Sequence, residues 1–135
     1  MNKYDFSSLT KIIYGSAPIP VTVLKRAIET VGNIFSQLYG LTESHVLTFF
    51  PADEHIVEGT EKEIRRLASC GREMPDCWVR VVREDGTDVN KDLEEKGEII
   101  AKSPAIMKEY FRMPEQTAKN IKDGWLYTGD IAAMD

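Results

Sequence analysis

The sequence has no apolar run long enough to cross a membrane. A membrane-spanning helix needs about 18 or more consecutive apolar residues, and no stretch of this chain approaches that length. The chain also has no basic surplus, because 17 lysines and arginines stand against 22 aspartates and glutamates, a net charge of −5. Binding to nucleic-acid phosphates without sequence preference requires such a surplus. We therefore expect neither a membrane span nor a nucleic-acid partner.

Cysteine and histidine are scarce. Cys70 and Cys77 form no Cys-x-x-Cys pair, and although a disulfide between them is possible in principle, two reduced thiols are the ordinary state in the cytosol. His45 and His55 have no cysteine or aspartate at zinc-ligand spacing, which argues against a zinc site. The first residues, Met1–Asp5, lack the apolar core of a signal peptide. We therefore expect a cytoplasmic protein.

Glycine and proline are too few, at 9 and 6, for a linker or a fibrous protein, and 135 residues suffice for one core. The apolar run Lys11–Tyr14 predicts a strand, and apolar residues at helical spacing predict a helix over Val21–Val31 that ends at Gly32. Ile34–Tyr39 predicts a second strand. Strand, helix and strand within about thirty residues indicate a βαβ unit with parallel strands.

The pattern changes at about residue 60. Thr60–Glu63 matches a capping box, which predicts a short helix through Ala68. A second short helix is expected from Pro114. The expected strands, mostly antiparallel, are Trp78–Arg83, Gly97–Lys102, Trp125–Tyr127 and Ile131–Met134.

The predicted fold class is α/β plus β: a βαβ edge of a parallel sheet over residues 1–59, followed by a small antiparallel, β-barrel-like subdomain over 60–135. Parallel sheets need more neighbours than two strands, with cover on both faces. We therefore expect the chain to be an excised segment of a larger enzyme.

One segment that could carry chemistry is Tyr14–Pro18, which follows the first predicted strand. A glycine and two small residues would let a flat ligand, or a thin acyl chain, lie against the backbone. An ordinary loop is the alternative interpretation.

Another is Tyr39–Glu43, after the second predicted strand. An aromatic ring can stack on a base, Thr42 can donate to a phosphate oxygen, and Glu43 can hold Mg²⁺ beside substrate phosphates. Alternatively, Thr42 and Glu43 begin a helix and Tyr39 belongs to the core.

The last such segment is Gly124–Asp130. A carboxylate fixed after a strand and a glycine can accept hydrogen bonds from two vicinal hydroxyls, as acidic residues do with ribose in other nucleotide folds. The alternative is a turn aspartate that binds its own backbone.

In this combination the segments resemble the adenylate-forming superfamily: acyl- and aryl-CoA synthetases, firefly luciferase and peptide-synthetase adenylation domains. Tyr39–Glu43 matches the family's aromatic-Gly-x-Thr-Glu motif, and Trp125–Asp130 matches its Trp-x-x-Thr-Gly-Asp motif. Gly15–Pro18 resembles its Gly-Gly-Ala-Pro motif, with Ser16 in place of the second glycine, and Gly97–Ile99 resembles its Gly-Glu-Ile/Leu strand.

The resemblance implies a role for each matching position. Tyr39 would stack on adenine, and Asp130 would bind the ribose hydroxyls. Thr42 and Glu43 are the expected catalytic residues, with Thr42 on the α-phosphate and Glu43 on Mg²⁺. The adenine and acyl pocket would be lined by Gly15, Ser16, Ala17 and Gly40, and the carboxylate substrate would lie near Ser44, His45 and Val46.

The family reaction joins a carboxylic acid to ATP as acyl-AMP, and a thiol, usually coenzyme A, then displaces AMP. The stretch Tyr110–Thr117 looks more like CoA ligases than peptide-synthetase domains. The resemblance therefore implies an ATP-dependent acyl- or aryl-CoA ligase with a place in fatty acid metabolism, using ATP, Mg²⁺ and coenzyme A. The family's phosphate loop and catalytic lysine find no match in this chain, so we expect the chain alone to be inactive.

Other functions stay open at this stage. One is a truncated module that binds a nucleotide or a partner without catalysis. Another is luciferase-like or peptide-synthetase chemistry on the same fold, because a fold does not fix a function. We also expect the isolated chain to dimerise through exposed strand edges in its first sixty residues.

Overall fold

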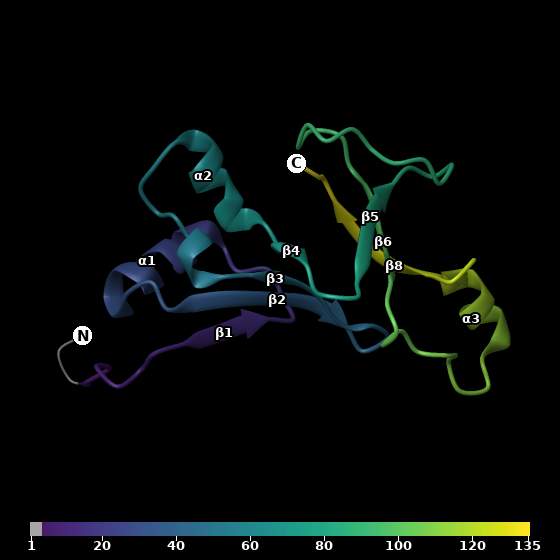
Figure 1. Cartoon of the computed structure of the whole chain (residues 1–135), viewed down its shortest axis with the longest axis horizontal. Coiled ribbons are helices and arrows are strands. Elements are labelled where there is room, and N and C mark those ends of the chain that lie inside the picture. Colours follow the sequence, from purple (N-terminus) through teal and green to yellow (C-terminus); the bar gives the residue numbers. More distant parts are fainter. Residues whose placement is uncertain (1–3) are drawn as a thin grey trace. The chain divides into compact units, whose positions relative to one another are not determined.

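The computed structural model describes residues 4–135, which group into two compact units (Figure 1). The first unit comprises the described residues up to Tyr39 together with Thr48–Arg72, and the second unit comprises Gly40–Leu47 and Glu73–Asp135. The chain passes from one unit to the other three times. The sequence-based division at residues 59 and 60 stays a prediction.

The first unit contains the predicted βαβ element. Strands β1 (Ile12–Gly15) and β2 (Phe35–Leu41) are parallel and connected through helix α1 (Val21–Val31). Their register runs from Ile12 opposite Phe35 to Gly15 opposite Leu38. The helix ends at Gly32, whose φ of 89° suits glycine, so both its predicted ends are confirmed.

The core of the first unit lies between α1 and the sheet. Leu24 and Ile28 form the buried face of α1, and they pack with Phe35 of β2 and with Leu67. In Figure 1, α1 and the later helix α2 lie on the same side of the sheet. Ile13 on β1 stays 59% exposed, so the sheet face that it belongs to has little cover from the described residues.

Strand β3 (His45–Phe50) is an element that the sequence analysis did not predict. It neighbours β2, and the four-stranded sheet has the order β1-β2-β3-β4, with β4 at Arg72–Glu73. Only residues 42–44 connect β2 to β3, and so short a connection can join only antiparallel strands. The sheet is therefore mixed: β1 and β2 are parallel, and a hairpin follows.

Short helices follow the hairpin. A 3₁₀ turn, η1, spans Ala52–Glu54, α2 spans Glu61–Arg65, and η2 continues it over Arg66–Ala68. The capping box is confirmed, because the Thr60 amide donates to Oε2 of Glu63 at 2.8 Å and the Glu63 amide donates to the Thr60 hydroxyl at 3.3 Å.

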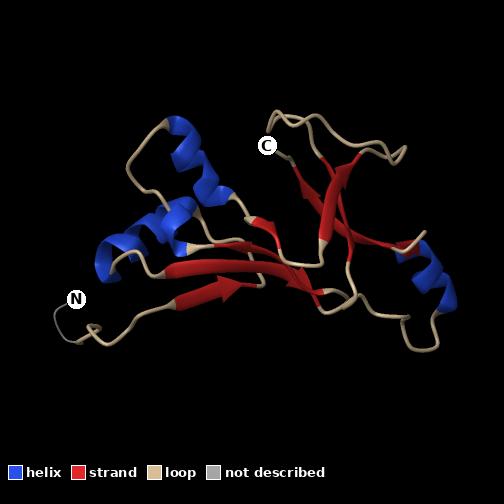
Figure 2. Cartoon of the chain, viewed as in Figure 1, coloured by secondary structure: helices blue, strands red, loops and turns tan. Residues whose placement is uncertain are grey.

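The second unit contains an antiparallel sheet, shown among the red arrows of Figure 2. Its strand order is β5-β6-β8-β7, with β5 at Trp78–Val82, β6 at Gly97–Lys102, β7 at Ile121–Lys122 and β8 at Trp125–Ala132. Helix α3 (Pro114–Asn120) precedes β7. The buried apolar residues of this sheet include Val81, Val82, Ile99, Ile100 and Leu126.

The prediction of two separate strands at Trp125–Tyr127 and Ile131–Met134 was wrong. Trp125–Ala132 form one strand, β8, which leaves out Ala133 and Met134, and its register against β6 shifts between Glu98 and Ile100. Gly129, at φ 79°, accommodates this irregularity, so the chain continues along the same sheet without a turn.

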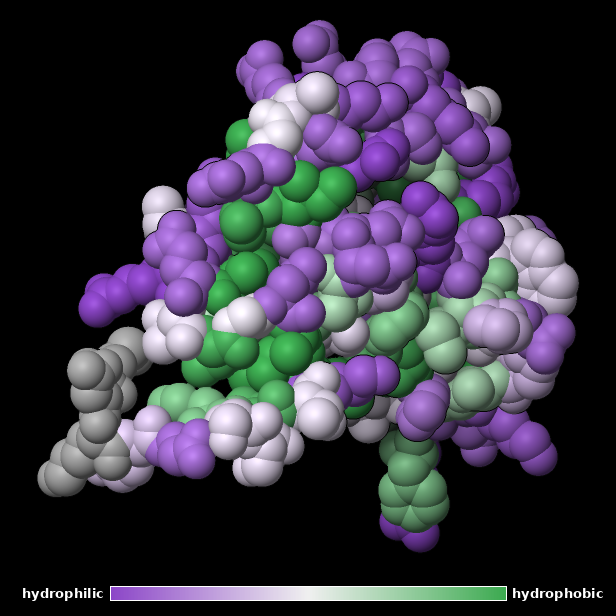
Figure 3. All heavy atoms as spheres, turned by 60° about the vertical axis from the view of Figure 1, so that its left-hand side comes forward, coloured by the Kyte–Doolittle hydropathy of each residue, from purple (hydrophilic) through white to green (hydrophobic). Residues whose placement is uncertain are grey.

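Apolar side chains also reach the surface, as the green areas of Figure 3 show on one face. No helix among residues 4–135 combines the length and apolar character that a membrane crossing requires. In the first unit the exposed large apolar side chains are Tyr4, Phe6, Leu9, Ile13 and Val23.

Candidate functional site

The carboxyl ends of β1 and β2 lie at the same edge of the sheet. Gly15 pairs with Leu38, so the segment that follows Gly15 and the residue Tyr39 come from neighbouring parallel strands. Ligands of open parallel sheets bind beyond such strand ends. The structure therefore brings together four predicted site residues within the first unit: Gly15, Ser16, Ala17 and Tyr39.

The backbone after β1 is tight. A Cβ atom at Gly15 would lie 2.4 Å from the carbonyl oxygen of Leu38, so a larger residue cannot fit without a shift. Ser16 has a φ of 64°, in the left-handed region that favours glycine. The position where the family motif has its second glycine is therefore a strained position here, and strain of this kind is frequent at functional sites.

The turn between β2 and β3 carries a second set of predicted site residues, which belong to the second unit. Gly40 is required by packing, because its Cβ would lie 1.9 Å from the carbonyl oxygen of His45. The side chain of Ser44 is fully buried: its hydroxyl accepts from the Leu41 amide and donates to the His45 carbonyl, both at 3.1 Å. Ser44 thus shapes the turn, whereas Thr42 and His45 are exposed.

Hydrogen bonds fix both the backbone and the side chain of Glu43. Its backbone carbonyl accepts from the Met107 amide at 2.7 Å, and its Oε1 accepts from the hydroxyl of Tyr110, also at 2.7 Å. The bond to Glu43 raises the pKa of Tyr110, because the carboxylate accepts only from the protonated hydroxyl. Within residues 4–135, Oε2 of Glu43 has no hydrogen-bond partner.

A single carboxylate with one open oxygen suits Mg²⁺. This ion keeps several waters and takes one or two carboxylates beside substrate phosphates, so it does not need a cage of protein ligands. The described part of the chain contains no group of three or more histidine, cysteine, aspartate or glutamate residues placed to hold a metal. The donor set at Glu43 therefore fits Mg²⁺ only as a partial site that phosphate oxygens and water complete.

Asp130 lies on β8 at the register shift, and it is exposed. Its amide donates to the Thr128 hydroxyl at 3.1 Å, which in turn donates to the Ile99 carbonyl at 2.7 Å. The Gly129 amide donates to Oε1 of Glu98 at 2.9 Å. Two strands thus fix the backbone that carries the Asp130 carboxylate.

In the sequence, the Tyr110 segment stands out only by its resemblance to CoA ligases, and no pattern places it in the site. Its contact with Glu43 joins residues 67 positions apart. No local pattern signals such a contact, although an aromatic residue just before the Pro114 helix start was visible in the sequence.

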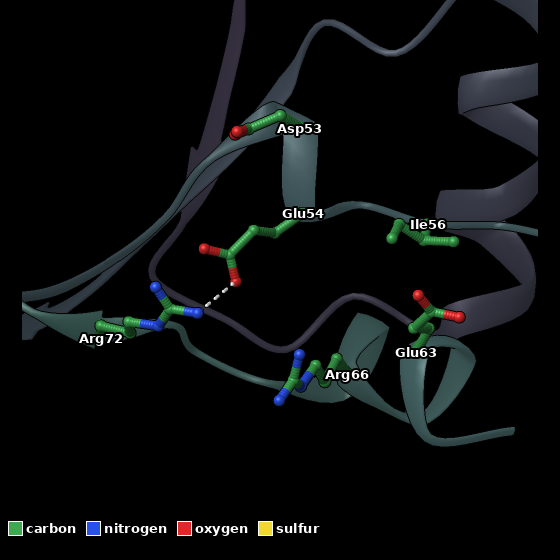
Figure 4. Close-up of a pocket in the computed structure, with 6 residues that line it drawn as sticks. All are labelled: Asp53, Glu54, Ile56, Glu63, Arg66 and Arg72. Atoms are coloured by element: carbon green, nitrogen blue, oxygen red, sulfur yellow. Dashed lines mark hydrogen bonds and ion pairs between the residues drawn. The ribbon is translucent and has the colours of Figure 1, made fainter. Parts of the chain in front are cut away.

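A separate cleft of about 260 Å³ lies in the first unit (Figure 4). Its acidic and basic side chains partly neutralise each other: Arg72 lies 3.3 Å from Glu54, with its own side chain 75% exposed. Such an exposed ion pair contributes little. None of the predicted site residues lines this cleft, whose walls are Asp53, Glu54, Ile56, Glu63, Arg66 and Arg72.

Comparison with known proteins identifies relatives of the chain. The medium/long-chain-fatty-acid–CoA ligase FadD8 of Mycobacterium tuberculosis is 36% identical over 132 residues. The solved structure of the amide bond synthetase McbA from Marinactinospora thermotolerans matches 97% of the chain with a TM-score of 0.84 and 31% identity. The o-succinylbenzoate CoA synthetase MenE from Bacillus subtilis, solved in complex with its acyl-adenylate intermediate, matches 96% with a TM-score of 0.79 and 27% identity.

The chain spans about a quarter of the length of these relatives. The matches cover 22% of FadD8, 25% of McbA and 24% of MenE. A sequence model described as AMP-binding enzyme matches residues 1–111, which is most of the chain. The chain therefore belongs to the family of AMP-binding enzymes.

Proposed function

We propose that the protein containing this chain activates a carboxylic acid as acyl-AMP and transfers the acyl group to coenzyme A. The observation that carries the proposal is the hairpin turn, which presents Thr42 and the anchored Glu43 carboxylate directly after β2. The names of the relatives, which include a fatty-acid–CoA ligase and a CoA synthetase solved with an acyl adenylate, support the same chemistry.

Each predicted site residue has a role in this proposal. Tyr39 stacks on adenine, and Asp130 accepts hydrogen bonds from the ribose hydroxyls. The exposed hydroxyl of Thr42 donates to an α-phosphate oxygen. The remaining residues border the adenine and acyl group, namely Gly15, Ser16, Ala17 and Gly40, or the carboxylate substrate, namely Ser44, His45 and Val46.

Backbone packing accounts for two of these residues. Gly15 and Gly40 approach neighbouring backbone so closely that no side chain fits at either position. Ser44 acts through the turn that it hydrogen-bonds, whereas the exposed His45 and the half-buried Val46 are available to the acid itself.

Glu43 would hold Mg²⁺ with its Oε2 atom. When bound, the ion supplies positive charge that neutralises the phosphate oxygens as charge develops on them. The contribution of this chain is to orient the carboxylate, through the hydroxyl of Tyr110.

Coenzyme A is the first candidate acceptor of the acyl group. A relative of similar fold is named as an amide bond synthetase, so an amine is the second candidate acceptor. The decisive measurement uses a protein of the relatives' length that contains these residues. Pyrophosphate exchange with a panel of carboxylic acids identifies the acid, and coenzyme A and amines are then offered separately. Exchange with no acid would contradict the proposal.

A cytoplasmic location completes the proposal. The relatives are named for CoA-dependent chemistry, and coenzyme A and ATP are available in that compartment. Fractionation of cells that express a tagged form of the protein tests this.

A further inference from the structure

The contact between Tyr110 and Glu43 has the geometry of a strong hydrogen bond. The hydroxyl oxygen lies 2.7 Å from Oε1 of Glu43, and both residues belong to the second unit. A hydroxyl that donates to an ionised carboxylate makes a bond roughly twice as strong as one between neutral groups. The Met107 amide, three residues earlier, fixes the Glu43 backbone at the same time.

Tyr110 is itself fixed by the start of α3. Its amide donates to the hydroxyl of Thr117 at 3.0 Å, and that hydroxyl donates to the Met113 carbonyl at 2.9 Å. The Met113 amide donates back to the Tyr110 carbonyl at 3.1 Å. A continuous set of hydrogen bonds therefore runs from α3 through Tyr110 to the Glu43 carboxylate.

We propose that Tyr110 is the positioning residue of the Glu43 carboxylate, holding Oε1 so that Oε2 faces Mg²⁺; this inference rests on the proposed metal role of Glu43. A free glutamate side chain samples several rotamers, and fixing it on binding costs conformational entropy. Mg²⁺ demands near-ideal octahedral geometry, so a ligand that is already oriented binds it better. Outer partners that orient metal ligands typically contribute 10- to 100-fold in metal affinity.

A purely structural tie between two loops is the competing explanation. The two explanations differ in what the hydroxyl holds. If it holds the carboxylate, its removal weakens metal binding while the Met107 amide keeps the loop in place. If it holds the loop, its removal also frees the Met107 amide.

The experiment uses a protein of the relatives' length that contains these residues, and Mn²⁺ as a spin probe for the Mg²⁺ site. Mn²⁺ shares the preference of Mg²⁺ for carboxylate, phosphate and water oxygens. Mn²⁺ is titrated in the presence of a non-hydrolysable ATP analogue and followed by electron paramagnetic resonance, which reads binding without turnover. Tyr110→Phe removes only the hydroxyl, and we expect about a 10-fold loss of Mn²⁺ affinity.

Tyr127→Phe is the matched control. Tyr127 is also half-buried in the second unit, but its ring, and not its hydroxyl, makes the contact with Nζ of Lys122, at 4.4 Å from the ring centroid. The Mn²⁺ affinity of the Tyr127→Phe variant should equal that of the wild type. A second pair tests the link to α3: Thr117→Val should weaken Mn²⁺ binding in the same direction, and Thr117→Ser, which keeps the hydroxyl, should restore it.

Amide hydrogen exchange provides the reading that separates the two explanations. In Tyr110→Phe the Met107 amide should stay protected. Weaker Mn²⁺ binding together with loss of this protection would overturn the positioning role in favour of a loop tie.

The Glu43→Gln variant separates failure of this inference from failure of the proposed function. If Glu43→Gln loses Mn²⁺ and Tyr110→Phe binds it as the wild type does, the positioning role is overturned and the metal role of Glu43 stands. If Glu43→Gln itself binds Mn²⁺ like the wild type, Glu43 is not the ligand. The metal role of Glu43 and the positioning role of Tyr110 are then both overturned.

Discussion

The half-buried Tyr14 and the buried His55 form a hydrogen-bonded pair, with 2.8 Å between the tyrosine hydroxyl oxygen and Nε2 of the imidazole. Nδ1 of His55 lies 2.7 Å from the carbonyl oxygen of Pro51, which can only accept, so Nδ1 carries the proton. Nε2 is therefore the acceptor, and the Tyr14 hydroxyl is the donor. His55 is 1% exposed and packs against the ring of Phe50, at 4.3 Å between centroids.

This arrangement predicts that the first unit loses stability at acidic pH. Burial lowers the pKa of His55, an effect that the Pro51 carbonyl and the nearby Asp53 and Glu54 carboxylates oppose, and burial raises the pKa of Tyr14 to about 12. The unfolded chain, with a histidine pKa of about 6.5, then binds more protons than the folded chain below that value. The stabilisation is complete above about pH 6.5 and is lost as the pH falls through the folded pKa.

The measurement is urea unfolding between pH 5 and 8, with histidine resonances followed by NMR. His55→Gln keeps an acceptor and a donor but does not titrate, so its free energy of unfolding should depend less on pH in this range. Tyr14→Phe leaves a buried acceptor unpaired and should lower the stability at pH 8 by about 1–3 kcal/mol. A steep acid dependence that persists in His55→Gln would assign the effect to other groups.

The chain by itself should have no ligase activity. It spans about a quarter of the length of its relatives, and the phosphate loop and catalytic lysine that the family resemblance implies have no match in it. Acid-dependent AMP formation is measured with the purified 135-residue chain, a mock preparation and a relative of full length. AMP formation above the mock preparation would contradict the prediction.

In a full-length protein that contains this chain, Glu43→Gln should slow adenylation by about 10²- to 10³-fold. Glutamine has nearly the same shape and can still accept from Tyr110, so the turn should be retained while the charge is lost. Pyrophosphate exchange at saturating Mg²⁺ provides the measurement. Glu94→Gln, an exposed glutamate of the same unit, is the control and should leave the rate unchanged. An unaltered rate in Glu43→Gln would remove it from the metal role.

Asp130→Ala should mainly weaken ATP binding. Loss of hydrogen bonds between a charged carboxylate and the ribose hydroxyls costs about 1.5–3 kcal/mol, which corresponds to roughly a 10- to 150-fold higher ATP KM. The backbone at Asp130 is fixed by Thr128 and Glu98, so the fold should survive the change. Deoxyribose analogues of ATP provide a second test, because they should lose less affinity in the variant than ATP does. An equal loss would count against ribose contact.

Sequence patterns predicted the helices and strands whose signals lie close together along the chain. Helix α1 was predicted at both ends because its apolar spacing and Gly32 are local signals. Strand β3 was missed because Leu47 and Thr48 are both buried, so the alternation that marks a half-buried strand is absent. Strand β8 was divided in two because Gly129 suggested a break, whereas the sheet register absorbs it.

The residues of the candidate site were likewise predictable only where a short motif marks them. Short motifs predicted Tyr39, Glu43 and Asp130, because the residue types in each motif carry their own chemistry. The partner of Glu43 could not be predicted in this way, since Tyr110 is 67 positions away and only the folded second unit brings them together. The roles of the motif residues themselves stay predictions until a ligand is observed.

The isolated chain should associate through the first unit. Strand β1 stands at the end of the sheet order, so one side of it offers unpaired backbone groups that can pair with another chain. Its Ile13 side chain is 59% exposed, and the large apolar side chains Tyr4, Phe6 and Leu9, which precede β1, are exposed as well. Monomers seldom expose apolar surface of this kind. We expect dimers at micromolar concentration, formed by pairing of β1 edges, while the antiparallel sheet of the second unit stays intact.

Light scattering over a concentration series measures the association. The matched variant is Ile13→Lys, which places a charge on the edge strand and should shift the chain toward monomer, because charged edge residues oppose pairing. Lys122→Ile, on β7 at the end of the other sheet, leaves the β1 edge untouched and should not relieve the dimer. A wild-type chain that stays monomeric, with sharp and dispersed amide resonances over residues 10–50, would show that the first unit closes its own core. The exposed edge of β1 would then have no consequence for association.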